Sequence, residues 1–184
     1  MEELDDPSLK GKPVIVAGLG RRGVVSTANY EVRKYGVRSA MPTAAARRRC
    51  PQGVYIFPRH ARYQAISDIV FEVFGQFTPT IEGLSPDEAF LDVTASLRLF
   101  SSIDAIGRRI KDDIKARTGL NASVGMAHNK LLAKLASELS KPDGFLSIHP
   151  DEIRGYLDPL PIGRMWTVGK VAEEALQKVG IRTI

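Results

Sequence analysis

The chain has 184 residues, of which 43% are hydrophobic and 26% are charged, an ordinary balance for a globular protein with a buried core. Its formal net charge of +5 and pI of about 9.4 favour an anionic partner, and nucleic acid, nucleotide phosphates and acidic membrane surfaces all stay open. The single cysteine, Cys50, excludes an intrachain disulfide and favours a cytoplasmic location, while the acidic N-terminus and the lack of a long apolar run argue against a signal peptide and a membrane span.

The beginning of the chain predicts a hairpin followed by a helix. Apolar, β-branched runs at 12–18 and 23–27 are typical of strands, with a glycine- and arginine-rich turn between them. Ser26-Thr27 can cap a helix that runs through Lys34 and is closed by Gly36. The turn matches the G-x-G-x-x-G pattern of dinucleotide-binding proteins, but that pattern must open a helix, and here a strand-like run follows. We therefore interpret these glycines as a turn.

Two helices and a second hairpin are expected next. Pro42 can open a short helix that must end by Cys50, because another proline follows. Apolar side chains recur at three- and four-residue spacing over 62–77, which predicts an amphipathic helix with a wide buried face. The runs 80–85 and 88–94 predict two strands joined by a tight turn.

The order of elements after this helix indicates the fold class. Ser101 or Ser102 can begin a helix that Gly119 ends, 121–127 predicts a strand of small residues, and 129–139 predicts an amphipathic helix. The resulting order of strand, strand, helix, strand and helix indicates an α+β fold that resembles a split βαβ fold without its first strand.

The character of the sequence changes near residue 150, where we predict a boundary followed by the start of a small helical unit. The segment 166–170 precedes a helix that ends near Gly180 and resembles a helix-hairpin-helix. In such a motif the backbone amides at the start of a helix can hold a DNA phosphate. The candidates for this contact are Val168, Gly169 and Lys170.

Two adjacent carboxylates, Asp87 and Glu88, lie at the turn of the second predicted hairpin. At a turn both side chains can converge on one point, and Mg²⁺ prefers carboxylate oxygens supplemented by substrate phosphates. The alternative is a solvated turn, because Pro-Asp-Glu is common turn chemistry.

Three polar side chains, Thr27, Tyr30 and Arg33, are spaced three residues apart and would share one face of the first helix. Their hydroxyls and guanidinium suit a polyphosphate, although a capped surface helix is the alternative. Lys141 follows a helix and precedes a proline turn, where it could present a fixed charge to phosphate or simply satisfy the end of the helix.

The remaining candidates have no clear chemistry. The run Arg47-Arg48-Arg49 is either a solvated face or a contact with a template backbone. Cys50 and the three histidines show no metal-ligand spacing, and we interpret them as structural.

Five segments, 4–13, 25–37, 85–94, 123–130 and 141–144, carry a resemblance that covers essentially the whole chain. Together they resemble the Y-family (translesion) DNA polymerases of the bacterial DinB type. The resemblance implies a ferredoxin-like palm lacking its first strand, a small α+β fingers subdomain and the start of a helical thumb. Its expected limits are 1–60 for the fingers, 61–150 for the palm and 151–184 for the thumb.

The same resemblance implies template-directed transfer of a nucleotide from a dNTP to a primer 3′-hydroxyl, with two Mg²⁺ ions. Asp87 would bind the metal ions and Glu88 would complete the site near the primer 3′-hydroxyl. Tyr30 and Arg33, helped by Thr27, would hold the triphosphate. Lys141 would reach the same phosphates from the palm. The implied partners are primer-template DNA and dNTP, with a sliding clamp only for the full-length parent and no membrane.

Two departures from the family pattern affect the expectation for this chain. Family members begin with a strand that carries another metal-binding Asp, followed by an aromatic steric gate, and both are missing here, as is the little finger. We therefore expect the isolated chain to have little or no polymerase activity. Because the missing strand is central in split βαβ folds, we also expect strand pairing between molecules or a rearranged sheet. The alternative to an enzyme is a non-catalytic polymerase remnant that binds nucleotide or DNA.

Overall fold

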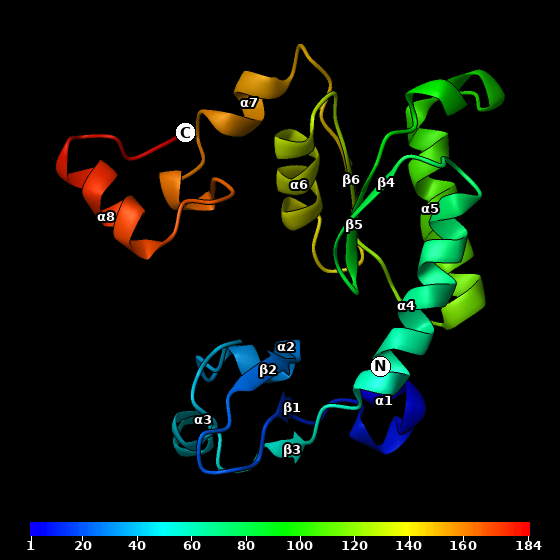
Figure 1. The fold of residues 1–184 in the computed structure, drawn as a ribbon. Helices are drawn as coiled ribbons and strands as arrows, with labels where there is room; N and C mark the ends of the chain where they lie inside the picture. Colours follow the sequence, from blue (N-terminus) through cyan, green and yellow to red (C-terminus); the bar gives the residue numbers. More distant parts are fainter. The chain divides into compact units, whose positions relative to one another are not determined.

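The computed structural model describes residues 1–184 and has two compact units, Met1–Ala65 and Ile66–Ile184 (Figure 1). Both units combine helices with small sheets, which confirms the predicted α+β class. No helix has the combination of length and apolar character that crossing a bilayer would require.

The first unit is built on a three-stranded sheet in the order β2-β1-β3. The central strand, β1 (Val14–Ala17), pairs antiparallel with β2 (Val25–Ala28), as predicted, and parallel with β3 (Val54–Ile56). All four residues of β1 are buried, as expected for a strand with a neighbour on each side. The helices of this unit are short: α1 (Glu2–Asp5), η1 (Pro7–Leu9), α2 (Tyr30–Arg33) and α3 (Thr43–Arg49).

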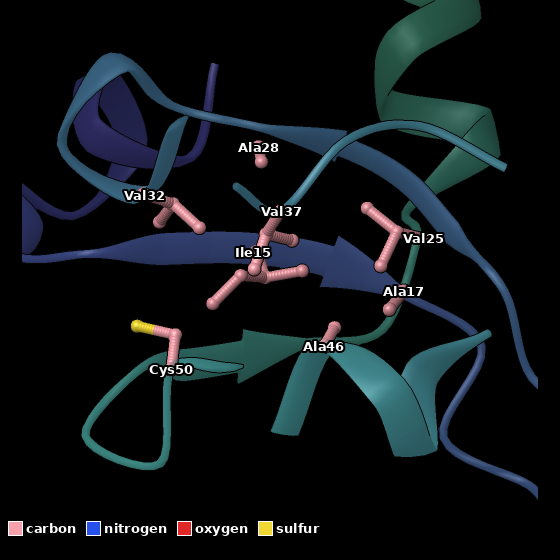
Figure 2. Packing of buried hydrophobic residues seen from close by; sticks show 8 residues of the cluster. All are labelled: Ile15, Ala17, Val25, Ala28, Val32, Val37, Ala46 and Cys50. Carbon is pink, nitrogen blue, oxygen red and sulfur yellow. The ribbon is translucent and has the colours of Figure 1, made fainter. Parts of the chain in front are cut away.

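The core of the first unit gathers along β1. Figure 2 shows Ile15 of β1 among small and β-branched side chains from β2, α2, α3 and the segments that follow these helices. The eight residues of this cluster are Ile15, Ala17, Val25, Ala28, Val32, Val37, Ala46 and Cys50. Burial raises the pKa of the Cys50 thiol, so this cysteine is a small core residue, as the sequence indicates.

The acidic helix α1 is held against the beginning of α4 (His60–Gly75) by hydrogen bonds between charged side chains. Arg59 and Arg62 both donate to the carboxylate of Asp5, at 2.8 Å from the nearest nitrogen of each, and hydrogen bonds from these two arginines hold the pKa of Asp5 at about 2. Glu2 accepts from the hydroxyl of Tyr63 at 2.7 Å and from Arg59. These bonds are confined to the first unit and join its two ends.

The structure corrects the predicted position of Thr27. This residue is in strand β2, opposite Val16, and is not on the helix with Tyr30 and Arg33. The helix begins later than predicted because Asn29, and not Ser26-Thr27, accepts the capping hydrogen bond.

The side chain of Asn29 makes four hydrogen bonds and thereby joins α2 to the sheet. Its side-chain oxygen accepts from the backbone N–H groups of Val32 and Val14, each at 3.2 Å. Its amide nitrogen donates to Glu3 at 2.7 Å and to the carbonyl of Lys12 at 2.8 Å. One side chain therefore fixes both the start of α2 and the entry to β1.

The second unit has three long helices and two separate two-stranded sheets. Figure 1 shows α6 on one face of the strands and α5 on the other, and both helices contact β6. The strand pairs are β4 (Ile81–Ser85) with β5 (Glu88–Leu91), antiparallel, and β6 (Val124–Met126) with β7 (Phe145–Ser147), parallel. The helices are α4, α5 (Ile103–Thr118) and α6 (Lys130–Leu139).

One apolar core lies between the helices α4 and α5 and both strand pairs. Its buried members are Val73, Phe74, Phe77, Val93, Ile106, Ile110, Ile114 and Met126. Side chains of β4, β5, β6 and β7 pack against it, including Ile81, Leu91, Val124 and Phe145. The two sheets thus share a single helical layer, although no strand pairing joins them.

The helix ends of the second unit agree with their predicted signals. Ser102 caps α5 by accepting from the N–H of Ala105, and Gly119 ends the helix with a φ of 73°. A positive φ costs glycine little, which explains the residue at this position. Asn129 caps α6 in the same way by accepting from Leu132.

Lys111 on α5 joins two loops of the second unit. Its ammonium donates to the carbonyl of Ala122, to the carbonyl of Asp143 at 2.9 Å and to the carboxylate of Asp143 at 2.8 Å. The two loops lead into β6 and β7, so both strands are fastened to the same helix.

The C-terminal segment contains α7 (Ile153–Leu157), η3 (Ile162–Arg164) and α8 (Lys170–Lys178). A helix after Gly169, ending near Gly180, is confirmed. Between β5 and α5 the chain forms η2 (Thr94–Leu99), so β5 is shorter than the predicted 88–94.

Replacing Asn29 with alanine is expected to destabilise the first unit by about 2 kcal/mol, because a helix cap and the partner of the Val14 N–H are both lost. Hydrogen exchange of the amides of β1 and α2 would measure the change. Asn129→Ala is the matched control, because Asn129 caps α6 without holding a strand, and it should cost about 1 kcal/mol. Equal losses for the two variants would contradict the joining role of Asn29.

Candidate functional site

The two adjacent carboxylates lie at the β4–β5 hairpin, as predicted. Pro86 and Asp87 form its two-residue turn, and Glu88 begins β5 opposite Ser85. The hydroxyl of Ser85 donates to the carboxylate of Asp87 at 2.6 Å, and the buried Ser67 of α4 donates to the carbonyl of Pro86 at 2.6 Å. The turn is therefore held from the strand and from the helix, while Asp87 itself is exposed.

Glu88 faces two lysines, Lys134 in the middle of α6 and Lys141 just after the end of this helix. Its Oε1 atom accepts from Nζ of Lys134 at 2.7 Å and lies 4.0 Å from Nζ of Lys141. The structure thus brings together two of the predicted site residues, Glu88 and Lys141. Lys134 is a third member that the sequence interpretation missed.

A fourth side chain, Glu138, completes the group. Its Oε1 atom lies 2.7 Å from Nζ of Lys141 and 3.3 Å from Nζ of Lys134. We call Glu88, Lys134, Glu138 and Lys141 the charge cluster. Its two carboxylates and two ammonium groups balance each other, which reduces the cost of their partial burial.

The pKa values in the charge cluster follow from this pairing. Partial burial favours the neutral amine of Lys134, but the carboxylates of Glu88 and Glu138 outweigh it and raise the pKa of Lys134. Burial also opposes ionisation of Glu138, and Lys141 and Lys134 nevertheless lower the pKa of this carboxyl. Lys134 and Glu138 are therefore both ionised near neutral pH.

The sequence did contain a signal for the missed residues. Lys130, Lys134, Glu138 and Lys141 are spaced by four, four and three residues, which places them along one face of α6 and its end. The spacing shows that they share a face, but only the packing of α6 beside β5 shows that Glu88 is the partner of Lys134 and Lys141.

The donor set at the hairpin fits a divalent metal ion in chemical type. Asp87 and Glu88 supply hard carboxylate oxygens, and Mg²⁺ is usually held by one or two carboxylates together with substrate phosphates and water. No group of three or more His, Cys, Asp or Glu side chains is arranged to hold a metal ion. Oxygens from a phosphate ligand or from water would therefore complete a metal site here.

The other predicted phosphate ligands belong to the first unit. The guanidinium of Arg33 stacks over the ring of Tyr30 at 4.5 Å from its centroid, and its Nε donates to the carbonyl of Ala28 at 3.4 Å. Both side chains are exposed, as is Thr27 on β2. Tyr30 and Arg33 thus form a preorganised pair of a ring and a guanidinium, which suits recognition of phosphate oxygens.

Two features singled out in the sequence have structural roles. The G-x-G-x-x-G segment leads into β2 and not into a helix, and the hydroxyl of Thr43 donates to the carbonyl of Gly18 at 2.8 Å, so the turn interpretation is confirmed. In the arginine run, Arg47 stacks over Tyr55 at 4.3 Å and Arg49 donates to the carbonyl of Gly36 at 2.7 Å.

The predicted DNA-contacting residues lie at the start of α8. Gly169 is the residue before the helix, Lys170 is its first residue, and Lys170 and Gly169 are exposed. Lys170 lies 3.8 Å from Glu174 along the helix. Contact of Val168, Gly169 and Lys170 with DNA stays a prediction.

Comparison with known protein families gives two matches along the chain. Residues 1–138 match the impB/mucB/samB family, and residues 150–181 match the IMS family HHH motif.

Curated relatives are similar over the whole chain. A DNA polymerase IV from Desulfatibacillum aliphaticivorans is 51% identical over 184 residues, which are 100% of this chain and 46% of that protein. A DNA polymerase IV from Halorhodospira halophila is 47% identical over 185 residues, covering 100% of this chain and 52% of that protein. The chain therefore spans about half the length of the curated relatives it matches.

Solved structures show the same similarity in three dimensions. The crystal structure of DinB from Sulfolobus solfataricus superposes with a TM-score of 0.92 at 36% identity, over 99% of this chain and 54% of that one. An insertion ternary complex of Dbh DNA polymerase gives a TM-score of 0.90 at 36% identity, again over 99% of this chain and 54% of that one.

Proposed function

Because the chain belongs to the impB/mucB/samB family of Y-family DNA polymerases, we propose that it is the part of a translesion polymerase that binds divalent metal and nucleoside triphosphate for template-directed DNA synthesis. The observation that carries the proposal is the placement of Lys141 beside Glu88 at the β4–β5 turn. A carboxylate with a fixed cation nearby suits a ligand that combines a metal ion with phosphate oxygens.

In this proposal the site residues of the second unit have separate roles. Asp87 and Glu88 would hold two Mg²⁺ ions, which would supply Lewis-acid activation of a primer hydroxyl and charge neutralisation at the pyrophosphate. Ser85 orients the carboxylate of Asp87 by its hydrogen bond. Lys141 donates to phosphate oxygens, and Glu138 keeps its ammonium in place until the phosphate arrives.

The first unit contributes recognition of the triphosphate. Tyr30 and Arg33 donate to phosphate oxygens, since both side chains are exposed and already stacked. Thr27, on strand β2, adds a hydroxyl from a position outside the helix. The amides of Val168, Gly169 and Lys170 at the start of α8 contact a DNA phosphate, a role supported by the match of this segment to the HHH motif.

The predicted subdomains are kept as part of the proposal: fingers at 1–60, a palm at 61–150 and the start of a thumb at 151–184. The separate β4–β5 and β6–β7 pairs support a palm of the split βαβ type without the strand that would join them. Open strand edges of this kind also support self-association by strand pairing between molecules.

A non-catalytic remnant is the second candidate. The observation that favours it is the absence of a group of three potential metal ligands, since a site with only two carboxylates leaves more positive charge for the substrate to neutralise. Primer extension by the chain would separate the candidates: robust extension at stoichiometric protein, lost in Glu88→Gln, supports an enzyme.

The metal-binding part of the proposal can be tested without turnover. Titration of Mn²⁺ in the presence of a dNTP, followed by electron paramagnetic resonance of the free ion, should show about tenfold weaker binding for Asp87→Ala and for Glu88→Gln, since each loses a charged ligand. Glu82→Gln is the matched control, because Glu82 is a paired carboxylate of the same hairpin that bonds Lys130. Similar losses in all three variants would count against a site at the turn.

A further inference from the structure

Lys134 stands out because it is the least exposed member of the charge cluster and has no role in the proposed chemistry. Its side chain is 16% exposed, against 39% for Glu88 and 38% for Lys141. It is the closest cation to Glu88, at 2.7 Å, whereas Lys141 is at 4.0 Å. The carboxylate proposed to hold a metal ion therefore already has a close positive partner.

A divalent ion and the ammonium of Lys134 compete for the same carboxylate. Two positive groups close to one oxygen repel each other, and the repulsion is weakly screened where one of them is mostly buried. The ammonium on Oε1 therefore opposes binding of a metal ion to Glu88, and this opposition is relieved if the ammonium moves away.

The structure provides a second partner for the displaced ammonium. Nζ of Lys134 is already 3.3 Å from Oε1 of Glu138, which lies one helical turn further along α6. Lys134 can thus leave Glu88 without becoming an unpaired buried charge, a state that would be strongly unfavourable.

We propose that Lys134 is a positioning residue that occupies Glu88 in the metal-free protein and passes to Glu138 when a divalent ion binds. The inference rests on the proposed function, since it assigns Lys134 to the same carboxylate. Its consequence is a lower affinity for the metal alone, so that Glu88 is released chiefly when metal and phosphate arrive together.

The test is Mn²⁺ binding by the intact chain without nucleotide, again followed by electron paramagnetic resonance of the free ion. Lys134→Met should bind Mn²⁺ about five- to tenfold more tightly than the wild-type chain, because a competing charge is gone. Lys134→Arg keeps the competing charge and should stay near wild type. Glu138→Gln should bind Mn²⁺ more weakly, since Lys134 then has no alternative partner. A merely structural lysine would not produce opposite changes for Lys134→Met and Glu138→Gln.

A matched control lies one turn earlier on α6. Lys130 pairs with Glu82 of the same hairpin. Lys130→Met removes the same charge without altering the surroundings of Glu88, so the Mn²⁺ affinity of this variant should equal that of the wild-type chain. Unchanged or weaker binding in Lys134→Met, with the wild-type fold retained by circular dichroism, would overturn the proposal. The double variant Lys134→Met with Glu88→Gln should lose the gain in affinity.

The Mn²⁺ affinities of Glu88→Gln and Lys134→Met distinguish failure of the proposed function from failure of this inference. If Glu88→Gln does not weaken Mn²⁺ binding in the presence of dNTP, the metal site itself is wrong. If Glu88→Gln weakens binding but Lys134→Met does not strengthen it, only the role of Lys134 is wrong.

Discussion

Gly125→Ala is expected to destabilise the second unit by about 3 kcal/mol or to displace α6 from its sheet, because there is no room for a methyl group at this position. A Cβ atom on Gly125 would overlap the backbone nitrogen of Ser137 and the carbonyl oxygen of Ala133, and would lie 2.8 Å from the carbonyl carbon of Ala136. All three atoms belong to the backbone of α6, so no change of side-chain rotamer can relieve the overlap. The close approach of β6 to α6 therefore requires glycine.

Hydrogen exchange at the amides of α6 and β6 would measure the loss, with thermal unfolding as a second readout. Gly155→Ala makes the same chemical change in α7, where a Cβ atom meets nothing within 4 Å, and alanine there should be neutral or stabilising by up to about 1 kcal/mol. Because α6 carries Lys134 and Glu138, Gly125→Ala should also disturb Mn²⁺ binding. A variant as stable as Gly155→Ala would contradict the close packing.

Arg33→Ala is expected to weaken dNTP binding in Mg²⁺ by about tenfold or more, because charge-assisted hydrogen bonds to phosphate are among the stronger polar contacts. The arginine is held over Tyr30 and does not need to be ordered when the ligand arrives, which keeps the entropic cost of binding low. Arg33→Lys should recover only part of the affinity, since an ammonium cannot reproduce a planar fork that both stacks and donates twice.

Isothermal titration of the chain with dATP would measure these affinities. Arg48→Ala is the control for net charge, because Arg48 is also an exposed arginine of the first unit but lies on α3 and is not assigned to the nucleotide. Equal losses for Arg33→Ala and Arg48→Ala would indicate a nonspecific effect of positive charge. Lys141→Ala should weaken the same binding if both residues serve one ligand.

The elements that could be predicted from the sequence are those with local signals at both ends. Helix α5 has a serine cap, an apolar face and a closing glycine, and the structure places its ends at Ser102 and Gly119. The β4–β5 hairpin is similar, because Pro86 and Asp87 mark its turn. Such signals depend only on neighbouring residues, so they can be recognised before the fold is known.

Other features were missed because they depend on tertiary contacts. The strands β3 and β7 have three residues each, too few to show a period, and each is recognisable only through its parallel partner. Thr27 was assigned to a helix because threonine is a good cap, whereas pairing with β1 keeps it in a strand. The pairing of Lys134 with Glu88 joins residues 46 positions apart, and nothing local marks it.

Parallel strands are not joined by a tight turn that would set their register. In the β6–β7 pair, Lys111 can set the register instead. The two carbonyls that it binds belong to Ala122 and Asp143, each two residues before the first paired residues of β6 and β7, Val124 and Phe145. A slip of one residue would separate those carbonyls from the shared ammonium and turn Phe145 from the core toward solvent. Lys111 of α5 thereby helps to fix the register of the parallel β6–β7 pair.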